Sequence, residues 1–433
     1  MRARTIGAAT LRAAVFAGLA AATLGGLSLA GARVTASQGE LAYTPPDAGP
    51  AADATSTASR PPAPGTLVVA VVLGTSATVA TDAMGPYEVF ARSSRFSVYT
   101  VARDAGPASV QGAPSIVPDH TFGDVDTRPE LAPDVVVVPA VEDPEGAVEK
   151  NTRDWVVQQH ARGARVLSVC AGAMLMAETG LLDGRTATSH WSRLSALRAA
   201  HPETRWVAGE RFVRDGNITT TAGITSGIPG ALSVMQDLAG TEEARKIGAQ
   251  VGYPGWSPDA STAIPSQTWA PSDWPVALNT LLPWGRPTVA ITLHDGDGEI
   301  DTASLFEVYS NSAAARTVAL SATGVVHTAH GLTLLTLTEA NTAVFDTRLR
   351  PGVHGTSGRA GFDGALEHLA NTTGEADARA AAKMIDYPTD ALDLGSDSGS
   401  PRTPLLSAAA VLLACLMGSA PSLVIRRRKT GEK

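Results

Sequence analysis

The stretch SVCAGAMLMAETGLLDGRTATSHW, residues 168–191, contains the side chain best suited to chemistry, Cys170. The chain has 2 cysteines, and the other, Cys415, lies in an apolar stretch near its end. Cysteine attacks as a thiolate, so a catalytic cysteine requires an accessible sulfur, a favourable setting for negative charge and a nearby proton carrier. A histidine, His190, follows near the end of the same stretch. The alternative is that Cys170 only fills space in the core.

The surroundings of Cys170 predict a sharp turn between a strand and a helix. The Val-rich segment ARVLSV comes before it, and the small residues Ala171 and Gly172 open a helical pattern after it. Such a turn holds a nucleophile at the carboxyl edge of a parallel sheet. Exposure there and the amino terminus of a helix both favour the thiolate. We therefore expect the pKa of Cys170 to lie below the ~8.5 of free cysteine.

The elements that must position Cys170 form an alternation of strands and helices over residues 66–254. The runs TLVVAVVL, DVVVVPA and ARVLSV are continuously apolar, which is typical of strands buried on both faces. The pattern predicts an α/β fold with a parallel sheet sandwiched between helices. Residues 35–65 are rich in Pro, Ala, Ser and Thr and are expected to be a disordered linker. Residues 255–285 are a connector rich in Pro and Trp.

An internal repeat follows the connector. GIPGALSVMQDLAGTEEARKIGAQVGYP (227–254) aligns without a gap with GFDGALEHLANTTGEADARAAAKMIDYP (361–388), and Asp301 matches Asp82. Residues 286–390 contain no counterpart of Cys170 or His190, so we interpret them as a truncated, degenerate copy. This copy is expected to pack on the first as an intramolecular pseudo-dimer, with the tryptophans of the connector buried between the two. A homodimer is the other arrangement considered.

Three ordered segments resemble the DJ-1/PfpI superfamily, whose fold is flavodoxin-like and is called class I glutamine amidotransferase-like. They are DAMGPYEVF (82–90), the stretch that contains Cys170, and GNITTTAGITSGIPGAL (216–232). The resemblance is strongest to the branch of isonitrile hydratases and the amidase-like domains of AraC-type regulators. It implies that Cys170 is the nucleophile, Asp82 its acidic neighbour and His190 a candidate base. Helix capping by Asp82 and simple packing of His190 are the alternatives.

Two departures from the family pattern weaken the expectation of isonitrile hydration in particular. Ala171 stands where isonitrile hydratases have Thr after the nucleophile. The family commonly has Pro-Gly-Gly after the third strand, where backbone N–H groups approach an oxyanion, whereas this chain has Pro139-Ala140-Val141.

Two classes of function remain open from the sequence. The first is a cysteine-dependent enzyme, similar to a hydratase or an amidase, that acts on a small electrophilic substrate. The second is a non-enzymatic module that binds a small ligand or senses redox state through a reactive Cys170. No cofactor and no metal site are expected, because metal-ligand spacing is absent from the sequence. The formal net charge of −8 argues against nucleic acid as a partner.

Both ends of the chain suggest a membrane protein. Residues 1–34 combine early arginines with an Ala-rich apolar stretch, which is typical of a signal peptide or an N-terminal membrane anchor. Residues 404–425 are apolar, long enough to cross a bilayer and followed by the basic tail 426–433. The sequence therefore predicts a cell-membrane protein, with one or two transmembrane segments, whose main domain is extracytoplasmic.

Overall fold

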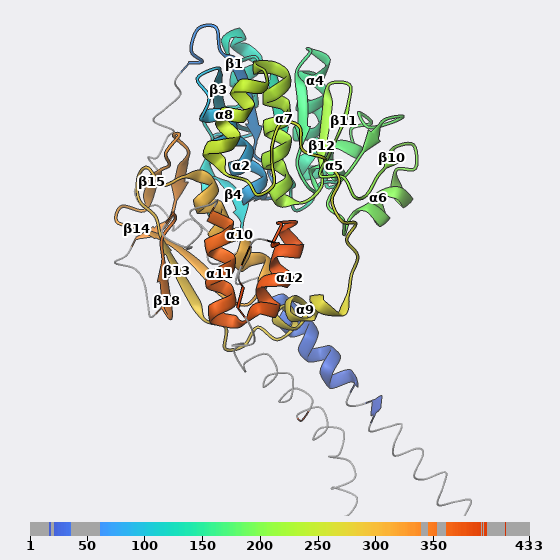
Figure 1. Cartoon of the computed structure of the whole chain (residues 1–433), viewed down its shortest axis with the longest axis vertical. Coiled ribbons are helices and arrows are strands. Elements are labelled where there is room, and N and C mark those ends of the chain that lie inside the picture. Colours follow the sequence, from blue (N-terminus) through green and yellow to red (C-terminus); the bar gives the residue numbers. More distant parts are fainter. Residues whose placement is uncertain are drawn as a thin grey trace, which may run out of the picture.

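The computed structural model describes residues 17–18, 21–35, 61–338, 345–352, 361–390, 392, 394–395 and 412. Its described residues form a first unit, residues 61–254, and a second unit within residues 286–390. The connector, residues 255–285, runs between them down one side of the molecule (Figure 1).

The first unit is built on a sheet that has, among the described residues, seven strands in the order β11-β12-β8-β7-β1-β3-β6. All neighbouring strands are parallel except β11 and β12. The strands are β1 (Leu67–Val72), β3 (Phe96–Ala102), β6 (His120–Thr121), β7 (Val135–Val138), β8 (Arg165–Ser168), β11 (Phe212–Asp215) and β12 (Ile218–Thr221). The order β3-β1-β7-β8-β12 is that of flavodoxin-like folds. The prediction of a parallel α/β sheet is therefore confirmed.

Helices cover both faces of this sheet, as the alternation of side chains along β1 shows. Val69 and Val71 point into one apolar cluster with α2, α7 and α8, whereas Val68 and Ala70 point into another with α4 and α5. The helices of the unit are α2 (Ala80–Ala91), α3 (Phe122–Thr127), α4 (Lys150–Ala161), α5 (Gly172–Ala177), α6 (Leu194–Ala200), α7 (Gly227–Ala239) and α8 (Thr241–Val251). A short parallel pair, β9 (Thr186–Ala187) and β10 (Arg205–Trp206), lies beside them.

The second unit contains a smaller parallel sheet with the order β17-β14-β13-β18 among the described strands. Its elements are β13 (Thr288–Thr292), α10 (Glu299–Ser312), β14 (Arg316–Ser321), β17 (Leu337–Thr338), β18 (Thr347–Leu349), α11 (Gly361–Thr373) and α12 (Glu375–Ile385). This strand order corresponds to the order β6-β3-β1-β7 in the first unit. No described strand stands where β8, which leads to Cys170, would continue the series.

A further sheet crosses from one unit to the other. Its order is β15-β16-β5-β4-β2, and β16 of the second unit pairs antiparallel with β5 of the first. The strands are β2 (Thr78–Val79), β4 (Ala108–Gln111), β5 (Ala113–Val117), β15 (Val325–His327) and β16 (Thr333–Leu335). One apolar cluster likewise contains Val69 of the first sheet and Val289 of the second. The two units therefore share a hydrophobic core.

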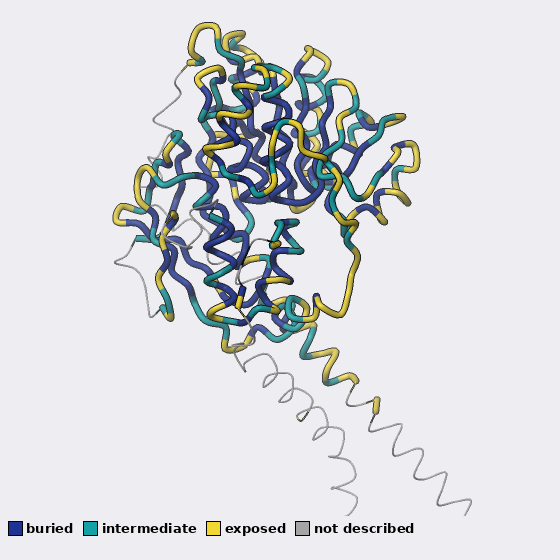
Figure 2. Tube along the Cα trace, viewed as in Figure 1, coloured by how far each residue is buried: buried dark blue, intermediate teal, exposed yellow. Residues whose placement is uncertain are grey.

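Helices α2 and α10 meet at the centre of the interface through reciprocal contacts. Glu88 Oε2 accepts a hydrogen bond from the Ile300 N–H (2.6 Å), and Glu307 Oε2 accepts one from the Thr81 N–H (3.0 Å). Residues 80–90 of α2 are all buried, because this helix lies between its own sheet and the second unit (Figure 2). The contacts are related as in an isologous dimer, although both sides belong to one chain.

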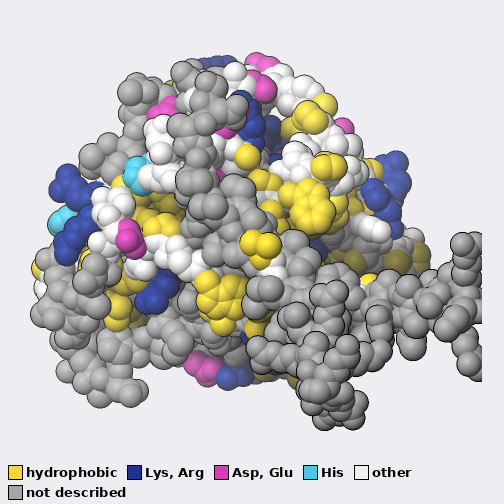
Figure 3. Space-filling view, turned by 90° about the horizontal axis from the view of Figure 1, so that it is seen from below, with side chains coloured by type: hydrophobic (Ala, Val, Ile, Leu, Met, Phe, Trp, Pro, Cys, Tyr) yellow, Lys and Arg dark blue, Asp and Glu magenta, His cyan; other side chains and the backbone are white. Residues whose placement is uncertain are grey.

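The connector does not bury its tryptophans as predicted. Trp269, Trp274 and Trp284 are 64%, 60% and 41% exposed, and Trp274 is the first residue of α9 (Trp274–Leu281). Only Trp256 packs against the core. Apolar side chains are visible on the lower face of the molecule in Figure 3, the end at which α9 lies in Figure 1. The prediction that tryptophans of the connector are buried between the units is therefore wrong, and the units meet through α2 and α10 instead.

The predicted cell-membrane location is also wrong. Within the part of the chain that the structure describes, no helix combines the length and the apolar character needed to cross a bilayer. Residues 21–35 are helical, and Thr35 Oγ1 at the end of this helix donates to the Thr280 carbonyl of α9 (2.8 Å). The predicted transmembrane helix 404–425 lies outside the described residues, apart from Leu412.

Candidate functional site

Cys170 lies in the turn between β8 and α5, where the sequence predicts it. Its backbone has φ +55°, in the left-handed region that a side chain normally avoids. The turn is tight because Gly172 passes close to β7. A Cβ on Gly172 would lie 2.4 Å from the Val138 carbonyl oxygen. A strained cysteine held at the carboxyl edge of the sheet has the backbone geometry of a nucleophile elbow.

Asp82 lies in the first turn of α2 and is completely buried. Its Oδ2 accepts a hydrogen bond from the Ala140 N–H (3.0 Å), while its Oδ1 has no hydrogen-bond partner. The N-cap of α2 is Val79, so helix capping does not explain Asp82. Burial, with a smaller effect from the nearby Glu307 carboxyl, raises the pKa of Asp82 well above its usual value. Asp82 is thus a carboxyl group whose protonated form burial favours, with one oxygen free for a further partner.

The structure contradicts the expectation of a low pKa for Cys170. The residue is only 4% exposed. Burial raises the pKa of its thiol well above the usual value, and the proximity of Asp82 raises it further. Helix α5 has only 6 residues, and a hydrogen bond from the Ala171 N–H opposes the shift without reversing it. In the described state Cys170 is therefore a buried residue whose thiol form is favoured, next to the Asp82 carboxyl, and not an exposed thiolate.

His190 is bound away from Cys170. Its Nε2 lies 2.8 Å from the carbonyl oxygen of Met384 in α12, and its Nδ1 lies 2.8 Å from Ser192 Oγ. Because a carbonyl can only accept, Nε2 carries the proton. Burial lowers the pKa of His190 to about 4. The side chain is thus a neutral imidazole that ties the first unit to the second, and neither ring nitrogen faces the thiol as a base.

The backbone N–H groups around the thiol are engaged in hydrogen bonds. The Cys170 N–H donates to Thr221 Oγ1 (3.2 Å), and the Gly172 N–H donates to the Val169 carbonyl (2.8 Å). The Ala140 N–H, at the position where the family has its Pro-Gly-Gly turn, is held by Asp82. An anionic oxygen on a bound substrate would have to replace one of these bonds.

Three residues that the sequence analysis did not assign also act on the site. Thr221 holds the Cys170 backbone, Glu307 of α10 raises the pKa of both Asp82 and Cys170, and Asp386 of the second unit also raises that of Cys170. Glu307 could have been found, because the match of Asp301 with Asp82 also aligns Glu307 with Glu88, and each glutamate is followed by Val and an aromatic residue. Nothing in the sequence places Thr221 or Asp386 beside Cys170.

The end of α12 lies over the loops that surround Cys170. The Asp386 carboxylate accepts hydrogen bonds from the Gly223 N–H (3.2 Å) and Ser226 Oγ (3.0 Å), and its carbonyl accepts one from Thr225 Oγ1 (3.0 Å). The Trp191 Nε1–H donates to the Lys383 carbonyl (3.3 Å). The second unit therefore covers the site although it supplies no thiol.

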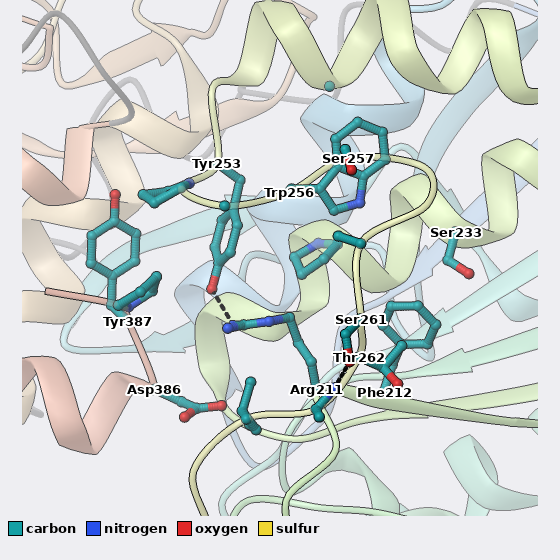
Figure 4. A pocket seen from close by; sticks show the side chains of 18 of the residues that line it. Arg211, Phe212, Ser233, Tyr253, Trp256, Ser257, Ser261, Thr262, Asp386 and Tyr387 are labelled. Carbon is teal, nitrogen blue, oxygen red and sulfur yellow. Dashed lines mark hydrogen bonds between the residues drawn. The ribbon is translucent and has the colours of Figure 1, made fainter. Parts of the chain in front are cut away.

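Two cavities lie near this cover, and Cys170 lines neither. An open groove of about 1340 Å³ runs between β11, α8, the connector and the end of α12. Figure 4 shows Arg211, Tyr253, Trp256, Asp386 and Tyr387 around it, and Arg211 donates to the Tyr253 hydroxyl (2.7 Å). A smaller cavity of about 20 Å³, also partly open to solvent, lies between Ser189, Trp191, Glu210 and Asp386 and is called the inner cavity below. Among the described residues, no cluster of His, Cys, Asp and Glu could hold a metal ion.

Comparisons with known proteins agree with this geometry. The model of the DJ-1/PfpI family matches residues 68–237. The isonitrile hydratase of Pseudomonas putida is 35% identical over 175 residues, which cover 40% of this chain and 72% of that enzyme. The HTH-type transcriptional regulator CdhR of Pseudomonas aeruginosa is 28% identical over 152 residues, and the match spans 44% of its length.

A crystal structure of a THiJ/PfpI family protein from Pseudomonas syringae is similar as well. It is 27% identical, and the alignment covers 50% of this chain and 84% of that protein with a TM-score of 0.40.

Proposed function

Since the chain belongs to the DJ-1/PfpI family, we propose that it is a cysteine-dependent enzyme, similar to a hydratase or an amidase, that acts on a small electrophilic substrate. The substrate class is a molecule with a C≡N, amide or carbonyl group. The likeness to isonitrile hydratase supports the reaction class. The observation that carries the proposal is the buried Asp82 carboxyl beside the strained Cys170, with an Oδ1 that no protein group satisfies.

The pair can transfer a proton without forming a free thiolate first. For a nitrile, the Cys170 sulfur would bond to the carbon while the thiol proton passes through Asp82 to the nitrogen. For an isonitrile, sulfur and proton would both end on the terminal carbon. Water then adds to this carbon, the C–S bond breaks and the proton returns to sulfur. The net reaction adds one water, and Asp82 lends and recovers one proton.

The raised pKa of Asp82 suits this role. A carboxyl whose pKa is raised by burial keeps its proton to a higher pH, and a protonated carboxyl can donate to a developing negative charge, as an ionised carboxylate cannot. The raised pKa of Cys170 indicates that the thiol loses its proton as it attacks and not beforehand.

We also propose that residues 286–390 are a shortened copy of the first unit that retains the scaffold and has lost the chemistry. The corresponding strand orders of the two sheets and the reciprocal hydrogen bonds of Glu88 and Glu307 support this interpretation. On this view the chain forms its own pseudo-dimer.

The second candidate is a non-enzymatic module that binds a small ligand. The open groove favours it, because this groove is far larger than the inner cavity and Cys170 does not line it. A redox sensor based on Cys170 is less well supported, because a buried thiol with a raised pKa forms little of the thiolate that peroxides oxidise.

Hydration assays on the full chain test the proposal. The purified protein is incubated with a small isonitrile, a nitrile, an amide and an aldehyde, and products are followed by mass spectrometry. Cys170→Ser is expected to abolish turnover, and Asp82→Asn to lower it by about 10²- to 10⁴-fold, the usual range for a lost acid–base group. Cys415→Ser is the matched control and should retain full turnover. Turnover that persists in Cys170→Ser would refute the role of the cysteine, and a wild type that turns over none of these substrates would favour the ligand-binding module.

A further inference from the structure

Asp386 is held in an unusual backbone conformation at the end of α12. Its φ of +57° lies in the left-handed region, which Asp tolerates better than most residues. Its counterpart in the aligned repeat is Gly252, whose φ is +68°. Glycine adopts this conformation freely, so the second unit carries a carboxylate where the first has no side chain.

The Asp386 side chain occupies space that the first unit leaves open for it. A Cβ on Gly223 would lie 2.0 Å from the Asp386 Cβ, so only glycine fits there while Asp386 is in place. The Gly223 N–H and Ser226 Oγ both donate to Asp386 Oδ2. Neither bond involves the other carboxyl oxygen, Oδ1. One oxygen thus anchors the side chain.

Asp386 lies on the wall between the two cavities. It lines the open groove and the inner cavity, as do Ile264 and Gln267 of the connector. The inner cavity is also lined by Ser189, whose Oγ donates to the Cys170 carbonyl (3.0 Å), and by Ala222, the neighbour of Thr221. A passage from the groove through this cavity would reach the loops that hold Cys170.

The charged side chains that line the inner cavity are acidic, whereas the groove is lined by both basic and acidic side chains. Glu210 and Asp386 contribute carboxyl groups to the inner cavity, and no Lys or Arg is among the described residues that line it. Burial raises the pKa of Asp386, and the positive charge of Arg211, which faces it in Figure 4, opposes this shift. An anion in the inner cavity would meet these two carboxyl groups with no Lys or Arg among the described residues that line it, whereas a small neutral molecule would not be repelled.

We propose that Asp386 is a specificity-determining residue of the Cys170 site, which the second unit contributes to the first. It closes the passage from the groove and admits small neutral molecules in preference to anions. This inference rests on the proposed function in so far as Cys170 is the reacting group. It narrows the proposed substrate class to uncharged electrophiles of only a few atoms, which the inner cavity could admit.

Alkylation of Cys170 by two reagents of similar size tests the proposal, because iodoacetamide is neutral and iodoacetate is an anion. The full chain is treated at about pH 8.5, close to the pKa of free cysteine, and peptide mass spectrometry separates Cys170 from Cys415. The wild type should react faster with iodoacetamide. Asp386→Asn keeps the shape and removes the charge, so the relative rate with iodoacetate should rise about fivefold, the effect of one like charge at contact distance in water.

Two further variants test the closure itself. Asp386→Gly relieves the backbone strain and removes the side chain, so Cys170 should react faster with both reagents. Gly223→Ala should do the same by pushing the end of α12 outward. The matched control is Asp390→Asn, because Asp390 lines the groove but not the inner cavity. Circular dichroism checks that each variant is folded.

An Asp386→Asn protein with the wild-type rate ratio would overturn the selectivity, and unchanged rates in Asp386→Gly would overturn the closure. A thiol that stays unreactive in every folded variant overturns the passage as a whole. None of these results depends on turnover. Faster alkylation of Asp386→Gly in a protein that hydrates no substrate would support this inference and remove only the proposed enzyme.

Discussion

Replacing Gly172 by Ala tests the turn on which the site depends. An added Cβ would lie 2.4 Å from the carbonyl oxygen of Val138 and 2.9 Å from that of Pro139. A comfortable carbon–oxygen contact is about 3.3 Å, so the end of β7 or the start of α5 would have to move by about 0.9 Å. Both obstacles are backbone atoms, which cannot turn aside as a flexible side chain would.

We expect Gly172→Ala to destabilise the protein by about 1–3 kcal/mol, the usual cost of overpacking a core. For a domain of this size that corresponds to a fall in Tm of about 2–4 °C for each kcal/mol. The displaced segment leads directly to Ala140, whose N–H holds Asp82. The rate of Cys170 alkylation should therefore change in the same variant.

The assay is thermal unfolding followed by circular dichroism, with Gly123→Ala as the matched control. Gly123 also lies in the first turn of a helix, α3, but a Cβ there would approach only Thr121 Oγ1, at 3.7 Å. Because alanine favours the helix, this control should be neutral or more stable by about 0.5–1 kcal/mol. A Gly172→Ala protein as stable as the Gly123→Ala control would refute the close approach of α5 to β7.

Two other predictions concern titration and the second unit. The pKa of His190 is lowered from 6.5 to about 4 by burial, so the unfolded chain binds a proton between these values that the folded one does not, and stability falls as the pH falls through this window. The contribution lost by pH 4 is about 3 kcal/mol, and urea unfolding of His190→Gln should show a flatter pH dependence than the wild type. In the second unit, Asp301→Asn should leave hydration unchanged while Asp82→Asn impairs it, because the described part of that unit offers no thiol to Asp301. Equal losses in the hydration assay would show that both units contribute chemistry.

The sheet and the meeting of Asp82 with Cys170 could be predicted from the sequence for a common reason. Continuous Val-rich runs identify buried parallel strands, and parallel strands present their carboxyl ends at one edge. Residues that follow β1 and β8 must therefore approach each other. Local patterns decide these features, so a single sequence contains enough information to find them.

The ionisation of Cys170 and the partner of His190 could not be predicted in the same way. The thiol pKa depends on burial and on neighbours that include Glu307 and Asp386, both from the second unit. His190 binds a backbone carbonyl of α12, and a carbonyl has no signature in the sequence. The prediction that the connector tryptophans are buried failed for a related reason, since composition shows that aromatic residues are present but not which surface they face.

The reciprocal bonds of Glu88 and Glu307 join two units that one polypeptide carries. An interface between separate chains is lost when the protein is diluted, whereas here the connector keeps the partners at an effective concentration that dilution does not change, of millimolar order for short linkers. Completion of the Cys170 site by Asp386 is then independent of how much protein a cell makes. Covalent linkage also frees the two halves to change separately, since each always meets the same partner and never a copy of itself. During evolution, one unit could lose its thiol and acquire a carboxylate without the same change occurring in the other unit.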